Sequence, residues 1–147
     1  MIHKAKKSLG QNFLKSEIAL RKIIEAGEIK KDDVILEIGP GKGALTEKLL
    51  EHALLVIAVE KDLKLFEFLK NKLKKEIKKG SLALINEDIL EFDASEAIKK
   101  SYKIIANIPY NITGAILKKF LTEKNQPKTM VLMVQHEVAT RILARDK

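Results

Sequence analysis

The sequence predicts an α/β fold, a doubly wound parallel sheet with helices on both faces. Three observations lead to this fold class. Short, continuous and mostly branched apolar runs recur along the 147 residues, stretches of helical periodicity alternate with them, and no repeat or Pro/Gly-rich linker interrupts the alternation. Strands covered on both faces have such continuous runs, and repeated strand–helix units form parallel sheets through right-handed crossovers. We therefore expect a single domain.

Five segments have the composition of buried strands. Each is a run of five to seven residues that is rich in Val, Ile and Leu and bounded by polar residues, which is typical of strands rather than of longer buried helices. The predicted strands are 34–38 (VILEI), 54–60 (LLVIAVE), 82–86 (LALIN), 103–107 (KIIAN) and 129–135 (TMVLMVQ).

Helical periodicity fills the intervals between these strands. A leading helix follows Ser16, which is a suitable N-cap. In 63–79 the apolar residues fall on one stripe and the lysines on the other face. The predicted helices are about 16–28, 43–52, 63–79, 112–123 and 136–145.

Composition restricts the kinds of protein this chain can be. It has no cysteine, which excludes disulfides and thiolate metal sites. No apolar run approaches the roughly 20 residues of a membrane-spanning helix, and the N-terminus lacks the apolar region of a signal peptide. HEVAT (136–140) has Thr140 where the zinc motif H-E-x-x-H needs its second histidine. We expect a cytoplasmic protein without membrane or metal partners.

The charge is strongly basic and clustered. The chain carries a formal net charge of +8. Residues 1–15 contain Lys4, Lys6, Lys7 and Lys15 and no acid, and 61–79 contains eight lysines against three acids. Clustered lysine is expected of a protein that binds a polyphosphate such as nucleic acid. A solvated, lysine-rich surface would give the same composition, so charge alone does not separate the two.

Polar side chains follow four of the predicted strands at their carboxyl ends. In doubly wound sheets the ligand binds beyond these ends, at the point where the strand order reverses. Carboxylates stand at three of the ends, namely Glu37, Glu60 and Asp88, and the amide of Asn107 stands at the fourth. We expect these side chains to form one polar rim.

The segment LEIGPGKGALT (36–46) predicts a strand, a glycine loop and a helix. Gly39, Gly41 and Gly43 permit a tight turn and a close approach of backbone N–H groups to a ligand. The spacing is not that of a Walker loop, which argues against nucleotide hydrolysis, and the third glycine comes one residue too early for G-x-G-x-x-G. Glu60, 21 residues after Gly39, can bind ribose hydroxyls, and Asp88 an adenine amine. Because Glu37 before the loop suits a cationic ligand better than a pyrophosphate, the pattern favours S-adenosylmethionine over a dinucleotide.

The segment Asn107-Ile108-Pro109-Tyr110 resembles the motif of amino-methyltransferases. The exocyclic amine of adenine is a poor nucleophile because its lone pair is delocalised into the ring. The amide oxygen of Asn107 and the backbone carbonyl of Ile108 can each accept one of its N–H groups, which aims the lone pair at the methyl group. Pro109 stiffens the turn, and Tyr110 offers a flat face on which a flipped-out base can stack.

The chain resembles the ribosomal RNA adenine N6-dimethyltransferase family. The matching segments appear in order and cover nearly all of the chain: KKSLGQNFL (6–14), VILEIGPGKGALT (34–46), VIAVEKD (56–62), INEDILEFD (85–93), ANIPYNIT (106–113) and MVQHEVATRI (133–142). The resemblance implies a Rossmann-like class I methyltransferase fold and methyl transfer to two adjacent adenosines near the 3′ end of small-subunit rRNA during ribosome assembly.

The resemblance also implies roles for individual residues. Gln11, Asn12 and Leu14 would close over the methyl donor. From the basic cluster in residues 1–15 we expect Lys4, Lys6 and Lys7 to contact RNA. Further donor contacts are expected at Gly39, Glu60, Asp88 and Asn107, with a catalytic role for Asn107 and Tyr110. Family members continue through two more strands and a helical C-terminal domain. We therefore expect 1–147 to be an incomplete S-adenosylmethionine-binding domain whose strand 129–135 self-associates as a free edge.

Two other readings share these motifs. A relative that methylates a large-subunit rRNA adenine and confers antibiotic resistance would have the same segments. A non-catalytic relative that uses the fold to bind nucleic acid is the second alternative, and the intact Asn107-to-Tyr110 motif argues against it.

Overall fold

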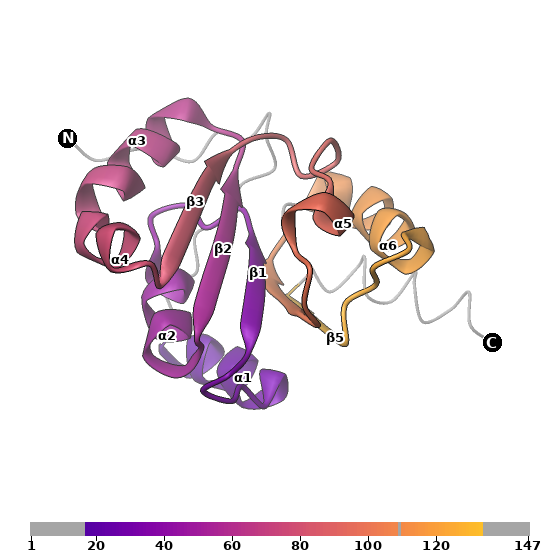
Figure 1. The fold of residues 1–147 in the computed structure, drawn as a ribbon, viewed down its shortest axis with the longest axis horizontal. Helices are drawn as coiled ribbons and strands as arrows, with labels where there is room; N and C mark the ends of the chain where they lie inside the picture. The colour runs from indigo at the N-terminus through magenta and orange to yellow at the C-terminus, as the bar shows by residue number, and fades with distance from the viewer. Residues whose placement is uncertain (1–16, 109, 134–147) are drawn as a thin grey trace.

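The computed structural model describes residues 17–108 and 110–133. Within them five parallel strands form one sheet in the order β3-β2-β1-β4-β5 (Figure 1). The predicted fold class is therefore confirmed. The strands are β1 (Val34–Ile38), β2 (Leu55–Glu60), β3 (Leu82–Asn86), β4 (Lys103–Asn107) and β5 (Thr129–Met133).

The helices alternate with the strands as expected, with shifts of about one residue at most ends. A short 3-10 helix, η2 (Tyr110–Ile112), precedes the last described α-helix, and one short helix, α5, was not predicted. The predicted helix 136–145 and the end of the predicted strand 129–135 lie outside the described residues. The α-helices are α1 (Glu17–Gly27), α2 (Ala44–His52), α3 (Leu63–Lys72), α4 (Lys74–Lys79), α5 (Ala94–Ala97) and α6 (Thr113–Thr122).

The segment predicted as one helix over 63–79 is two helices. Leu73 has φ −112° and ψ 28°, which ends α3 and begins α4. The apolar spacing of four runs unbroken through Leu65, Leu69 and Leu73, and these side chains are buried. The break therefore changes the direction of the chain while the apolar stripe stays on the sheet.

The order of the strands reverses between β1 and β4. The chain builds outward from β1 to β3 on one side and then returns to place β4 and β5 on the other. Because all the strands are parallel, their carboxyl ends lie at one edge of the sheet. This edge at β1 and β4 is where doubly wound sheets bind ligands.

Helices cover both faces of the sheet and enclose two apolar clusters. One cluster lies under α1 to α4 and includes Leu20, Leu49 and Leu69, and the other lies under α5 and α6 and includes Ala94, Ile116 and Phe120. Alternate residues of each strand point to opposite faces. Ile35 and Ile105 belong to the cluster on the α1–α4 side. By this alternation Glu37 and Asn107 face the same side, and so does Glu60 after Ala58.

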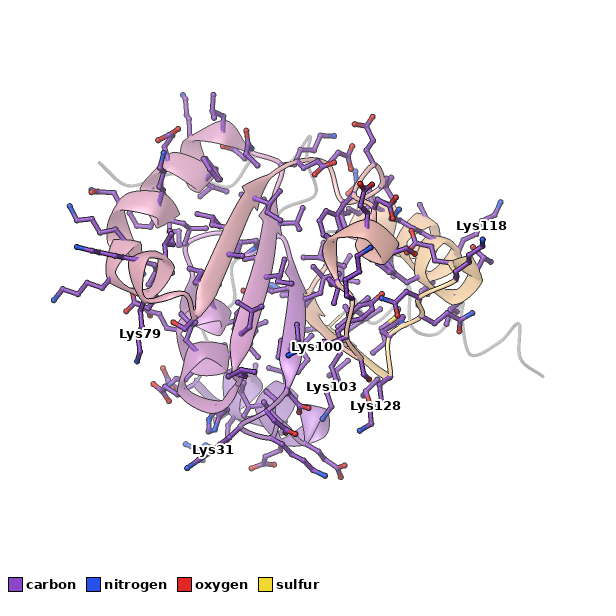
Figure 2. All side chains as sticks on the ribbon, viewed as in Figure 1. Lys31, Lys79, Lys100, Lys103, Lys118 and Lys128 are labelled. Carbon is purple, nitrogen blue, oxygen red and sulfur yellow. The ribbon has the colours of Figure 1, made fainter. Side chains whose placement is uncertain are left out.

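Lys103, at the start of β4, links the end of α1 to the sheet at the edge opposite the carboxyl ends of the strands. Its ammonium lies 2.9 Å from the Asp33 carboxylate and donates to the carbonyls of Gly27 and Glu28 at 3.0 and 2.9 Å. Its side chain is 6% exposed, whereas Lys100 lies nearby on the surface (Figure 2). A buried charge of this kind is tolerated because every proton of the ammonium has an acceptor.

No helix in the ranges 17–108 and 110–133 combines the length and the apolar character that a membrane span requires.

Candidate functional site

The glycine loop between β1 and α2 needs glycine for two different reasons. Gly39, Gly41 and Gly43 all have positive φ, at 65°, 61° and 92°, a region that other residues enter at a cost. A Cβ on Gly43 would lie 2.8 Å from a methyl group of Leu69 in α3, so this glycine also permits close packing. A Cβ on Gly39 would meet nothing within 4 Å. The loop is thus packed against α3 at Gly43 and open at Gly39, where a ligand can approach the backbone.

Glu60, the last residue of β2, is held in place by backbone donors. One carboxylate oxygen accepts from the N–H of Gly41 at 3.1 Å and the other from the N–H of Asp62 at 2.8 Å. The side chain is buried, and burial raises the pKa of Glu60 against the lowering effect of these hydrogen bonds. A carboxylate has about four acceptor sites. Glu60 therefore keeps capacity for two ribose hydroxyls in a fixed orientation.

Glu37 lies one residue before the end of β1 and is more deeply buried than its predicted role requires. It is 1% exposed, and it accepts a hydrogen bond of 2.5 Å from the Thr46 hydroxyl in the first turns of α2. Burial raises the pKa of Glu37 to about 8, the Thr46 bond lowers it and the charge of Glu60 raises it further. In this conformation Glu37 joins β1 to α2, and its contact with the cationic part of a donor stays a prediction.

Hydrogen bonds of a side-chain amide join the end of β3 to the end of β2. The Asn86 amide donates to the backbone carbonyls of Glu60 and Lys61 at 2.9 and 3.2 Å. Asp88 accepts from the N–H of Leu90 at 3.0 Å and pairs with Lys61 at 3.3 Å. The Asp88 side chain is 28% exposed, so one side of it stays open to a ligand.

Asn107 ends β4 beside the glycine loop. Leu36 pairs with Ile104 in the sheet, and three residues farther along each strand come Gly39 and Asn107. Asn107 is half-buried, and the N–H of the next residue, Ile108, donates to the Met133 carbonyl at 3.2 Å. The chain then turns into η2. This register places the predicted catalytic amide next to the open side of the loop.

The structure thus brings most of the predicted site residues to one edge of the sheet, and most of the others lie outside the described residues. Glu37, Glu60 and Asn107 lie at or next to the carboxyl ends of neighbouring strands on one sheet face, and Asp88 follows β3 beside them. For Tyr110 only the backbone, in η2, is described. The predicted donor residues Gln11, Asn12 and Leu14, the predicted RNA contacts Lys4, Lys6 and Lys7, and Pro109 lie outside the described residues.

Two residues at this edge were not predicted as part of the site. Thr46 holds Glu37, and Asp62 caps α3 by accepting from the N–H of Leu65 at 3.0 Å. Asp62 had a readable signal, because an aspartate before an amphipathic stretch is a common N-cap. Thr46 had none, since its role depends on the turn of the loop.

The side chains at this edge fit a cationic adenosine-containing donor. Carboxylates and amides supply acceptors, a fixed carboxylate stands where a ribose would bind, and Gly39 leaves room at the backbone. No three His, Cys, Asp or Glu side chains gather into a possible metal site in the part of the chain that the structure describes.

Comparison with known proteins gives consistent matches. The family model "Ribosomal RNA adenine dimethylase" matches residues 2–147. The Ribosomal RNA small subunit methyltransferase A of Dehalococcoides mccartyi (strain CBDB1) is 47% identical over 144 residues, which are 97% of this chain and 48% of that protein. The chain therefore spans about half the length of this curated relative.

Two solved structures are similar over most of the chain. The crystal structure of a dimethyladenosine transferase from Plasmodium falciparum has a TM-score of 0.75 and 35% identity, covering 90% of this chain and 46% of that one. The crystal structure of 23S rRNA methyltransferase ErmE has a TM-score of 0.78 and 28% identity, covering 91% of this chain and 52% of that one.

Proposed function

The chain belongs to the ribosomal RNA adenine dimethylase family, and from this premise we propose that it transfers methyl groups from S-adenosylmethionine to the N6 amines of adenosines in small-subunit rRNA. The targets would be two adjacent adenosines near the 3′ end of that RNA, modified in the cytoplasm during ribosome assembly. One observation carries the proposal: Glu60 and Asn107 end their strands, Glu37 lies one residue before the end of β1 between them, and all three are on the same face of the sheet around a glycine loop that is open at Gly39.

The donor would bind along β1, β2 and β3. Glu60 would accept from the two ribose hydroxyls, and the exposed side of Asp88 from the adenine amine. Gly41 and Asp62 fix the Glu60 carboxylate through backbone N–H groups at 3.1 and 2.8 Å, so little ordering is left to occur on binding. When bound, S-adenosylmethionine supplies a methyl group attached to a positively charged sulfur, which is the electrophile of the reaction.

The target adenine would bind next to β4. The Asn107 side-chain oxygen and the Ile108 carbonyl would each accept one N–H of the amine, which turns the nitrogen lone pair toward the methyl group. Catalysis would then consist of orientation and electrostatic stabilisation. The methylated amine is acidic while it carries positive charge, so water can take its proton and no general base is needed. Tyr110 would stack on the flipped-out base.

Sequence similarity favours the small-subunit substrate over the large-subunit alternative. The relative named as a small-subunit enzyme is 47% identical to this chain, and the 23S rRNA methyltransferase is 28% identical. The 23S rRNA methyltransferase has the same fold as this chain, so the distinction rests on the sequence rather than on the architecture.

The test is to map the modified nucleoside. Unmethylated small and large ribosomal subunits are incubated separately with the protein and isotopically labelled S-adenosylmethionine, and the RNA is digested and measured by mass spectrometry. Labelled N6,N6-dimethyladenosine in the small-subunit RNA supports the proposal. Label in the large-subunit RNA alone supports the large-subunit alternative, and RNA binding without any label supports the non-catalytic one.

A further inference from the structure

The surface of α3 and α4 holds most of the excess positive charge of the protein. Residues 61–79 carry eight lysines and three carboxylates, a local net charge of +5 within the +8 of the whole chain. The Asp62 carboxylate is buried at the start of α3, where it accepts from the N–H of Leu65. Glu67 and Glu76 are therefore the carboxylates of this segment that remain near the surface.

Six of these lysines form a surface that we call the lysine strip. Lys61 pairs with Asp88, and Lys72 lies 3.5 Å from Glu47 and donates to the Lys42 carbonyl. The other six are exposed and make no hydrogen bond or ion pair within the described part of the chain. The lysine strip consists of Lys64, Lys70, Lys74, Lys75, Lys78 and Lys79.

The lysine strip extends away from the donor site along one flank of the domain. α3 begins three residues after Glu60, and α4 ends at the opposite end of the neighbouring strand β3, where Lys79 projects outward (Figure 2). At the helical rise α3 is about 15 Å long and α4 about 9 Å, and the chain changes direction between them at Leu73. Leu65 and Leu69 of α3 and Leu73 between the helices are buried on the sheet, and Ile77 of α4 is partly buried against the same cluster. The six lysines of the strip are exposed.

An aromatic ring lies within this surface. Phe68 is 46% exposed, and the Lys72 ammonium is 5.6 Å from the centre of its ring. Exposed aromatic rings among lysines are typical of surfaces that contact RNA, because lysines neutralise phosphates and a ring can stack on an unpaired base.

We propose that the lysine strip binds the phosphate backbone of rRNA outside the methylation site and positions the RNA so that its target adenosine reaches Asn107. The proposal rests on the proposed function for the identity of its partner. The lysine strip starts at the same strand edge as the donor site and leads away from it, so that one RNA can contact both. Phosphate contacts of this kind set position and affinity rather than sequence preference.

Two variants of equal charge test the proposal. The strip variant carries Lys70→Gln, Lys74→Gln, Lys75→Gln and Lys78→Gln. The control carries Lys22→Gln, Lys31→Gln, Lys100→Gln and Lys124→Gln, four exposed lysines on other parts of the surface. Both lose four positive charges. Binding to unmethylated small subunits is measured at several KCl concentrations, and circular dichroism checks that each variant is folded.

The strip variant is expected to bind at least about tenfold more weakly, and the slope of log affinity against log salt should fall by about 3, since each lost phosphate contact removes roughly 0.7–0.9. The control should change by less than about threefold. Equal losses in both variants would overturn the proposal, because they would reflect net charge alone. So would an unchanged strip variant, or one that loses binding to phosphatidylglycerol vesicles while keeping its affinity for the subunits.

The outcome is separable from that of the proposed function. Binding of S-adenosylmethionine, measured by calorimetry, should be the same in both variants and in the unaltered protein, because none of the eight lysines contacts the donor site. Salt-dependent RNA binding through the strip in a protein that methylates nothing would support the strip and contradict the proposed function. If the strip variant methylates the RNA and binds the subunits with normal affinity, the proposed function is supported and the role of the lysine strip is contradicted.

Discussion

Replacing Glu37 with glutamine should flatten the pH dependence of stability. The Glu37 carboxyl is 1% exposed, and burial raises its pKa from 4.5 to about 8. Between these values the folded protein holds a proton that the unfolded chain has released. Stability from this group is therefore fully present below pH 4.5 and is lost as the pH rises toward 8.

The magnitude follows from linkage. One proton held only in the folded state changes the free energy of unfolding by up to about 1.4 kcal/mol per pH unit. Glu60 adds to the slope in the same direction, because burial also raises its pKa. Glu37→Gln removes the Glu37 part and keeps an acceptor for the Thr46 hydroxyl. The slope between pH 5 and 8 should therefore fall by up to about 1.4 kcal/mol per unit.

Urea unfolding followed by circular dichroism at pH 5, 6, 7 and 8 measures this effect. Glu51→Gln, at an exposed position of α2, is the matched control and should keep the slope of the unaltered protein. Parallel pH profiles for the unaltered protein and Glu37→Gln would refute the reasoning, since they would mean that Glu37 is charged in the folded state.

Three further predictions concern catalysis, stability and association. Asn107→Ala should reduce methyl transfer by about 100-fold or more, the scale of losing a preorganised polar contact, while calorimetry shows donor affinity within a few-fold; undiminished transfer would exclude the proposed role. Lys103→Met should lower the free energy of unfolding by about 3–5 kcal/mol, because it leaves the Asp33 carboxylate and two carbonyls without their buried partner; urea unfolding that matches Lys100→Met, at an exposed site, would contradict this. The isolated segment 1–147 should self-associate with concentration through β5, which pairs with β4 alone within the described residues and carries neither charge nor proline; a monodisperse monomer by light scattering at high concentration would disprove it.

The strands were predictable because short, branched apolar runs between polar residues indicate buried strands. β1, β3 and β4 have the predicted bounds, since each is a continuous branched run between polar residues. β2 begins one residue later than predicted, where Leu54 is 52% exposed. The break at Leu73 was not predictable: leucines spaced by four continue through it, and no glycine or proline marks it.

The polar edge was predictable from topology, and its hydrogen bonds were not. Parallel strands put Glu60, Asp88 and Asn107 at one edge whatever their contacts. The bond from Gly41 to Glu60, however, depends on the positive φ of the loop glycines, which the sequence permits without specifying. Lys103 shows the same limit: its place at the start of β4 was predicted, but its burial depends on the end of α1, 75 residues earlier.

A titration with S-adenosylmethionine tests most directly the claim that this edge is a methyl-donor site. Calorimetry at pH 7 should show binding to the unaltered protein and none for NAD. Glu60→Ala, folded by circular dichroism, should bind at least about tenfold more weakly, the scale of losing hydrogen bonds to a charged group, while Glu51→Ala should bind normally. Binding of NAD in place of S-adenosylmethionine, or undiminished affinity in Glu60→Ala, would contradict the account.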